Sequence, residues 1–199
     1  MKVSTPRRDL NVKGSLITLA VLLLLGIVAW LVTQRDSESL AQSQVGGPVQ
    51  EQFAPGDRDA VMPFRARLLS GATFDSADLA GRVAVFNVWG SWCGPCRKEA
   101  PALARVARET VNETTFVGIN VRDNDASARA FERGLEVPYD SVVSDDSDQA
   151  LPAFGGALAT AAVPSTVVVD REGRIAARVV GIVTYRTLKA LVDEVVAEP

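Results

Sequence analysis

The residues best suited to chemistry in this sequence are its two cysteines, Cys93 and Cys96, which lie three positions apart. The chain contains no histidine, so Ser-His-Asp and Cys-His catalysis are excluded, together with zinc sites that need imidazole. Two thiolates cannot complete a four-ligand zinc or iron–sulfur site within one chain. The pair therefore predicts thiol–disulfide exchange, with no metal site and no cofactor.

The context of the cysteines sharpens this prediction. An apolar strand is predicted to end just before Cys93 and a helix to begin there, and unpaired N–H groups and the dipole of a helix N-terminus favour a thiolate. Cys93 is therefore the predicted nucleophile. Cys96, almost one turn later on the same side, is placed to attack a mixed disulfide at Cys93.

The two residues between the cysteines fit the same prediction. Pro95 suits the first helical turn, where its missing N–H is not needed, and Gly94 leaves the approach to Cys93 open. An inert structural disulfide is the alternative, but so short a loop restrains little unfolded-chain entropy.

The rest of the chain predicts an alternation of strands and helices. Residues 82–89 form a near-continuous apolar run, typical of a central strand covered on both faces. Helical periodicity follows, and a second strand is predicted at 115–121, a helix at 126–134, a hairpin from 165–170 and 174–181, and a closing helix at 184–197. The first helix is predicted to share one apolar face among Cys96, Ala100, Leu103, Ala104, Ala107 and Val111. This order predicts an α/β fold with a mixed sheet and helices on both faces.

A membrane anchor is predicted at residues 14–34, which contain no charged side chain. About 20 such residues in a helix cross a hydrocarbon core of roughly 30 Å, whereas a buried globular helix would be expected to show a polar stripe. Basic residues precede this run, so the positive-inside bias places residues 1–13 in the cytoplasm and the remainder outside, at the cell membrane. A cleaved signal peptide is the alternative, although the run is long for one and no small-x-small site follows it.

The segment after the anchor is predicted to be a linker. Residues 35–58 are largely polar and without period, which is typical of a flexible tether, and they lead into a domain at 59–199. The chain has a net charge of −3 although its N-terminus is basic. The external domain is therefore acidic, and no nucleic-acid partner is predicted.

The motif resembles the thioredoxin superfamily, because Trp-Cys-Gly-Pro-Cys at 92–96 is the active-site sequence of thioredoxin itself. Over roughly residues 60–197 and the anchor, the chain is similar to the membrane-anchored TlpA/ResA group and to CcmG/DsbE-type proteins of bacterial cytochrome c maturation. That closer resemblance rests on Val-Phe-Asn-Val-Trp at 85–89, Gly-Ile-Asn-Val-Arg-Asp-Asn at 118–124, Pro-Tyr at 138–139 and Val-Pro-Ser-Thr at 163–166. It implies a thioredoxin-like sheet flanked by helices.

The resemblance also implies roles for residues outside the motif. Val163 and Pro164 are expected to form a cis-proline dipeptide that faces the cysteines and leaves the Val163 backbone free to pair with an extended substrate; a trans-proline loop is the alternative. Trp92 is expected at the rim of the site, beside Gly94 and Pro95.

A proton-transfer group is expected at Glu99. Cytosolic thioredoxins carry a buried aspartate where this chain has Asn87, which cannot titrate, whereas ResA-like proteins have a glutamate three residues after the second cysteine, where Glu99 lies. By that resemblance Glu99 would exchange a proton with Cys96. The alternative is an exposed acid favoured by the helix dipole.

Together these observations predict an extracytoplasmic thiol–disulfide oxidoreductase. The resemblance implies a reductase that acts on protein disulfides, with apocytochrome c as client and a membrane thiol carrier of the CcdA/DsbD type as electron donor. Two alternatives stay open: an oxidant that installs disulfides in secreted proteins, and a module that delivers Cu(I) to an oxidase.

Overall fold

The computed structural model describes residues 47–198, and the folded unit begins at Pro48. The predicted cytoplasmic segment 1–13 and the predicted anchor 14–34 lie outside the described residues. Within residues 47–198, no helix combines the length and the apolar character needed to cross a bilayer.

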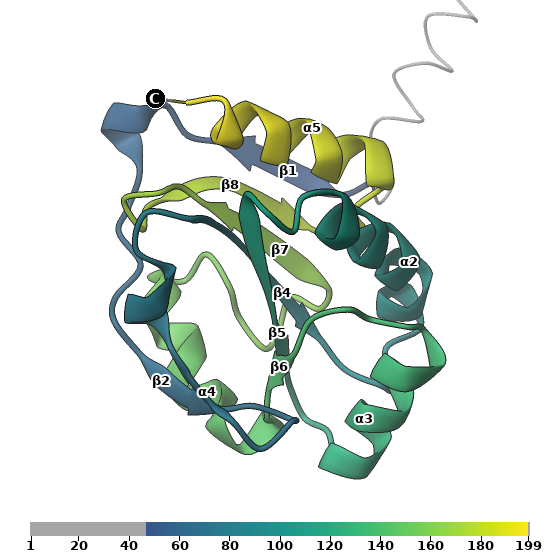
Figure 1. Cartoon of the computed structure of the whole chain (residues 1–199). Helices are drawn as coiled ribbons and strands as arrows, with labels where there is room; N and C mark the ends of the chain where they lie inside the picture. The colour runs from purple at the N-terminus through teal and green to yellow at the C-terminus, as the bar shows by residue number, and fades with distance from the viewer. Residues whose placement is uncertain (1–46, 199) are drawn as a thin grey trace, which may run out of the picture. The chain divides into compact units, whose positions relative to one another are not determined.

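The domain is built on a six-stranded mixed sheet with strand order β1-β8-β7-β4-β5-β6 (Figure 1). Strand β4 is central; it pairs in parallel with β5 and antiparallel with β7. Strands β2 and β3 form a separate two-stranded sheet. The strands are β1 (Val49–Gln52), β2 (Arg65–Arg67), β3 (Thr73–Asp75), β4 (Val83–Trp89), β5 (Thr114–Asn120), β6 (Ser141–Val142), β7 (Ser165–Val169) and β8 (Ile175–Val180). The helices are α2 (Gly94–Glu109), α3 (Asp125–Gly134), α4 (Ser147–Ala150) and α5 (Tyr185–Val196).

Helices α2 and α5 lie together on one side of the sheet, whereas α4 and β2 lie on the other (Figure 1). All seven residues of β4 are buried, and their side chains alternate between the two faces. Val83 and Val85 pack with the apolar residues of α2 and α5, whereas Phe86 packs with Phe64 and Phe154 on the opposite face. The same alternation directs Asn87 toward α2.

The predicted mixed sheet with helices on both faces is confirmed, as is each strand and helix predicted from periodicity, to within a few residues. The prediction that Val111 belongs to the apolar face of α2 was wrong. Val111 is 62% exposed because α2 ends at Glu109, two residues before the predicted apolar stripe would reach Val111.

The predicted linker boundary also needs correction. Residues 49–52 lie within the predicted tether 35–58, but they form β1 and pair antiparallel with β8, where Val49 faces Val180 and Gln52 faces Ala177. The domain therefore begins about ten residues before position 59. Local composition missed this strand because it is polar and exposed, and its pairing depends on a partner more than 120 residues away.

A buried ion cluster fastens this N-terminal segment to the C-terminus. The Arg58 guanidinium, with its side chain 4% exposed, contacts Asp170 at 3.0 Å and Glu198 at 2.6 Å. Asp170 also accepts hydrogen bonds from the backbone and the guanidinium of Arg174. These contacts join residue 58, the turn after β7 and the end of the chain.

Replacing Arg58 with Ala should destabilise the domain by roughly 2 kcal/mol, because it removes the ion pairs with Asp170 and Glu198 and leaves Arg174 as the one remaining cationic partner of the buried Asp170 carboxylate within residues 47–198. Arg65→Ala is the matched control: Arg65 pairs with Asp75 at the surface with its side chain 77% exposed, so it should cost under about 1 kcal/mol. Urea unfolding of both variants measures the difference. Equal losses would show that residue 58 adds nothing beyond a surface ion pair.

Candidate active site

Cys93 and Cys96 form a disulfide with an S–S distance of 2.06 Å at the start of α2. Cys93 is the N-cap residue, with extended backbone, and its Sγ accepts a hydrogen bond from the Cys96 N–H at 3.1 Å. The first N–H groups of a helix have no intrahelical partner, so this sulfur takes the place of a capping oxygen. Such a position favours negative charge on Cys93 once the disulfide opens.

Both cysteines are nearly buried in the disulfide form, with exposed fractions of 3% for Cys93 and 2% for Cys96. Gly94 and Pro95, which lie between them, are exposed. Pro95 occupies the first turn of α2, as predicted.

Trp92 forms an exposed aromatic surface next to Cys93, with 51% of its area open to solvent. Its ring lies against the Gly90 backbone, where a Cβ would come within 2.5 Å of the indole nitrogen. The indole N–H donates to the Val121 carbonyl at 3.2 Å, and the Arg122 guanidinium lies 4.5 Å from the ring centre. The ring is therefore held in place rather than free to turn, in agreement with its predicted position at the rim.

Asp123 holds the loop that carries the cysteine motif. Its carboxylate accepts hydrogen bonds from the Ser91 N–H at 2.6 Å and the Ser91 hydroxyl at 2.8 Å, and a further one from Asn120 Nδ2. Burial alone would raise the pKa of Asp123, but these hydrogen bonds outweigh it and lower the pKa. No role was predicted for Asp123. The available signal was topological, because the carboxyl ends of parallel strands meet at one edge of a sheet.

The Val163–Pro164 peptide bond is cis, which confirms the expected isomer. Val163 packs against the apolar cluster that contains both cysteines and Trp89. Pro164 is buried, and its carbonyl accepts a hydrogen bond from the Gly181 N–H at 2.9 Å. The dipeptide thus lies beside the disulfide, directly before β7.

Glu99 is buried behind the cysteines, with only 1% of its area exposed, so the alternative of an exposed first-turn acid was wrong. Its Oε1 accepts a hydrogen bond from Asn87 Nδ2 at 2.8 Å, and its Oε2 accepts one from the Val183 N–H at 2.9 Å. Burial raises the pKa of Glu99 to about 7, although the hydrogen bonds from Val183 and Asn87 oppose the shift. This carboxyl can gain or lose a proton near neutral pH.

Asn87 links Glu99 to the sheet. Besides Glu99, its Nδ2 contacts the Ser165 carbonyl at 3.3 Å and the Thr166 hydroxyl at 3.1 Å. It therefore orients Glu99 through an amide that does not titrate.

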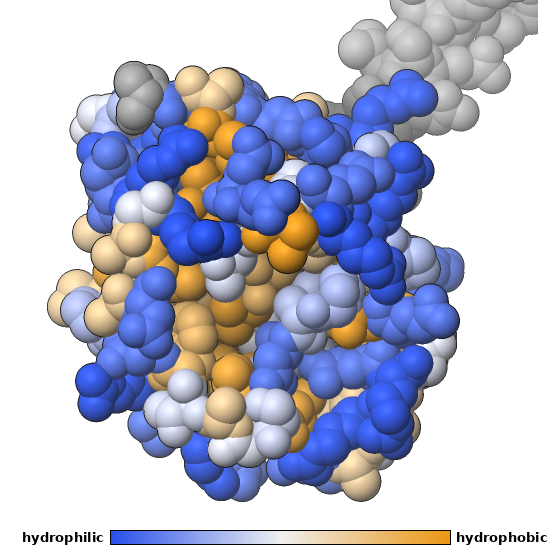
Figure 2. All heavy atoms as spheres, viewed as in Figure 1, coloured by the Kyte–Doolittle hydropathy of each residue, from blue (hydrophilic) through white to orange (hydrophobic). Residues whose placement is uncertain are grey.

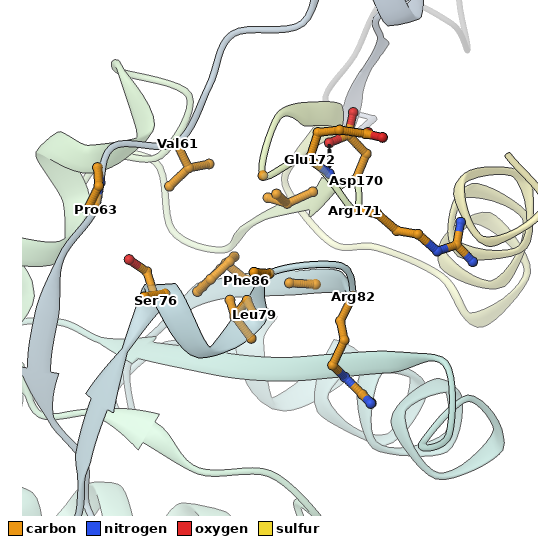
Figure 3. A pocket seen from close by; sticks show the side chains of 14 residues that line it. Val61, Pro63, Ser76, Leu79, Arg82, Phe86, Asp170, Arg171 and Glu172 are labelled. Atoms are coloured by element: carbon orange, nitrogen blue, oxygen red, sulfur yellow. Dashed lines mark hydrogen bonds between the residues drawn. The ribbon is translucent and has the colours of Figure 1, made fainter. Parts of the chain in front are cut away.

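A separate hollow of about 410 Å³ lies away from the cysteines (Figure 3). Phe86 and Leu79 line it, whereas Arg82 and Arg171 point away from it (Figure 3) and hydrogen-bond to backbone carbonyls elsewhere. On the face of the molecule shown in Figure 2, hydrophobic residues gather in the middle, within a border of hydrophilic residues. The acids that line it, Asp170 and Glu172, are already paired with Arg58 and Arg174, so this hollow offers no chemistry comparable to that of the cysteine site.

A disulfide at the N-terminus of a helix, a cis-proline beside it and a buried acid behind it define a thiol–disulfide oxidoreductase with a thioredoxin-like fold. The chain belongs to the Redoxin family, which it matches over residues 55–192.

Relatives and solved structures agree with this class. The chain is 33% identical to the thiol:disulfide interchange protein DsbE of Pseudomonas aeruginosa, over 94% of this chain and 93% of that protein. It is 28% identical to the thiol-disulfide oxidoreductase ResA of Bacillus subtilis, over 58% of this chain and 62% of ResA. The crystal structure of a DsbF homologue from Corynebacterium diphtheriae aligns with a TM-score of 0.66 and 30% identity, over 76% of this chain and 96% of that one.

The raised pKa of Glu99 gives a prediction for stability against pH. Between about pH 4.5, its ordinary pKa, and about 7, its pKa in the fold, the folded protein binds more protons than the unfolded chain. Stability should therefore fall as pH rises through this window, by up to roughly 3 kcal/mol in total. Glu99→Gln should remove the contribution of Glu99 to this fall and flatten the stability curve in this window, because an amide does not titrate.

Urea unfolding of the oxidised protein at several pH values measures this effect. Glu113→Gln, which removes an exposed acid, should leave the wild-type slope unchanged. Parallel stability curves for wild type and Glu99→Gln would contradict the assignment of the slope to Glu99.

Proposed function

We propose that this thiol–disulfide oxidoreductase is a membrane-anchored reductase of protein disulfides that works outside the cytoplasm, in cytochrome c maturation. The observation that carries the chemistry is that a sulfur caps helix α2: the Cys93 Sγ accepts a hydrogen bond from the Cys96 N–H at the start of the helix. This arrangement makes Cys93 the better thiolate of the pair and therefore the attacking sulfur.

The reaction has two exchange steps. The Cys93 thiolate attacks one sulfur of a substrate disulfide, which forms a mixed disulfide and releases the other substrate sulfur as a thiolate. Cys96 then loses its proton and attacks the Cys93 sulfur, which releases the second substrate thiolate and forms the Cys93–Cys96 disulfide. The substrate gains two electrons, and a thiol donor must return the protein to the dithiol.

Glu99 takes part in this cycle as a proton acceptor and donor for Cys96. It lies one helical turn after Cys96, buried, with a pKa of about 7, and a group with a pKa near the working pH serves best in either direction.

Substrate binding uses the surface around the disulfide. Among the hydrogen bonds of residues 47–198, none involves the Val163 backbone, so its N–H and C=O can pair with an extended peptide. Trp92 supplies an exposed apolar face on the other side of the motif, and the exposed Gly94 and Pro95 let a substrate approach Cys93.

The anchor at 14–34 is part of this proposal. The alignment with the Pseudomonas aeruginosa protein covers 94% of the chain, more than the residues from 47 onward can supply, so the likeness extends into the N-terminal segment. A domain outside the cytoplasm cannot reach cytosolic NADPH. A tether beside a membrane thiol carrier of the CcdA/DsbD type would raise the effective concentration of donor and acceptor.

Apocytochrome c is the proposed client, because the thiols of its Cys-x-x-Cys-His motif must be free before haem is attached. Support comes from the resemblance to CcmG/DsbE-type and ResA-like proteins and from the relatives named DsbE and ResA.

Replacing Cys96 with Ala in the full chain should trap the mixed disulfide on Cys93, because no thiol remains to resolve it. Mass spectrometry of the trapped species should identify peptides that carry haem-attachment cysteines. The matched control is the double variant Cys93→Ala, Cys96→Ala, which should trap nothing. A broad set of secreted proteins instead, with normal cytochrome c levels in cells that lack this chain, would redirect the function to general oxidative folding.

A reporter enzyme that is active only outside the cytoplasm, fused after Pro199, should be active, because the basic residues before position 14 retain the N-terminus inside. The same fusion without residues 1–34 should be inactive. Activity of a cytoplasm-only reporter in the full-length fusion would refute the proposed topology.

A further inference from the structure

A second acid, Glu132 on helix α3, lines a cavity that Cys96 also lines. It follows the buried Ala128 by four residues and adjoins the buried Phe131, so the spacing turns it partly inward. Phe131 stacks on Trp89 with ring centres 4.5 Å apart, which fixes α3 against the segment that leads to the cysteines.

Glu132 and Cys96 line the same cavity, a space of about 10 Å³ whose lining residues come from β4, α2, α3 and the chain at 137–139. That volume is close to the lower limit for one water molecule. The wall includes polar side chains besides Glu132, namely those of Asn87 and Tyr139.

Glu132 also lines a surface hollow of about 340 Å³ on the outer side of α3, together with Arg129, Arg133 and Asp140. Val137 and Tyr139 border both spaces as well. Glu132 therefore borders both the Cys96 cavity and the surface hollow.

The two acids near Cys96 differ in their hydrogen bonds. Both oxygens of Glu99 accept one, from Asn87 and Val183. The Glu132 Oε1 is buried, and no group among the described residues donates to it. A buried acceptor without a donor is costly, and a proton on that oxygen would relieve the cost.

Charged neighbours act on Glu132 from each element around it. Burial raises its pKa, the Ser141 hydroxyl opposes the shift, Asp140 adds to it, and Arg129 of its own helix opposes it. From the adjoining segment, burial raises the pKa of Tyr139, and the charges of Glu99 and Glu132 raise it further. Tyr139 therefore stays protonated, and Glu132 is the carboxyl group among the residues that line this cavity.

We propose that Glu132 exchanges the proton of Cys96 with solvent on the α3 side of the domain. When Cys96 attacks the mixed disulfide, its S–H proton passes to the Glu132 carboxylate, directly or through one water, and from there to the surface hollow. When the Cys93–Cys96 disulfide is reduced, the same proton returns to the Cys96 thiolate. Glu99 also exchanges a proton with Cys96, as proposed above, but of the two acids only Glu132 borders the surface hollow and provides the exit to solvent. This inference rests on the proposed role of Cys96 as the resolving cysteine.

The test uses the reduced full chain in detergent and the chromogenic disulfide dithionitrobenzoate. Attack by Cys93 releases one coloured thiolate, and resolution by Cys96 releases a second, so stopped-flow absorbance separates the two steps. In Glu132→Gln the first step should be unchanged. The second should slow about tenfold near neutral pH, and the deficit should close above about pH 9, where hydroxide can take the proton.

Two variants keep the result interpretable. Glu132→Asp retains a carboxyl and should recover part of the rate, and Glu136→Gln removes an exposed acid nearby and should match wild type. An unchanged second step in Glu132→Gln, or a deficit equal at every pH, would overturn the inference and leave the oxidoreductase assignment intact. A wild-type protein that releases only the first thiolate would instead refute the role of Cys96.

Discussion

The hydrogen bond between Asn87 Nδ2 and Glu99 Oε1 is the contact on which the site depends. It joins the central strand β4 to helix α2 inside the layer between sheet and helix. A buried carboxyl needs donors for both oxygens, and the second one, the Val183 N–H, comes from the loop before α5. Three elements are thus held in one arrangement by a single side chain. That arrangement fixes the rotation of α2 about its axis, which in turn places Cys96 inward and the Cys93 sulfur over the helix end.

The start of α2 shows how structure and chemistry share the same atoms. Pro95 removes one N–H that would otherwise lack a partner, and the Cys96 N–H is taken up by the Cys93 sulfur. The N-terminus of a helix is usually capped by a side-chain oxygen of Ser, Thr, Asn or Asp. Here the cap is a sulfur that becomes a thiolate when the disulfide opens, so the helix gains its most favourable capping charge in the state that attacks substrate. The loop before α2 is held in place because the Asp123 carboxylate accepts hydrogen bonds from the N–H and the hydroxyl of Ser91.

Local patterns in the sequence determine the long elements and the cysteine pair, and these were predicted correctly. The apolar run of β4 predicts a buried strand, and all residues of β4 are indeed buried. By contrast, β1 is polar and is a strand only because β8 lies beside it. Glu99 shows the same limit. Its spacing from Cys96 fits both an exposed and a buried acid, and what decides is a backbone donor 84 positions away. Spacing along a helix places a side chain on a face, but it does not say what covers that face.

The two acids beside Cys96 suit different parts of a proton-coupled exchange. Glu99 is enclosed, and each oxygen already accepts a hydrogen bond, so its gain or loss of a proton changes the charge behind the cysteines without opening a route to solvent. Glu132 borders both an inner cavity and a surface hollow, and its buried Oε1 accepts no hydrogen bond from the described residues. A proton can reach that oxygen without breaking an existing bond. Thiol–disulfide exchange needs both properties, because the thiolate must be stabilised within the protein while its proton leaves it.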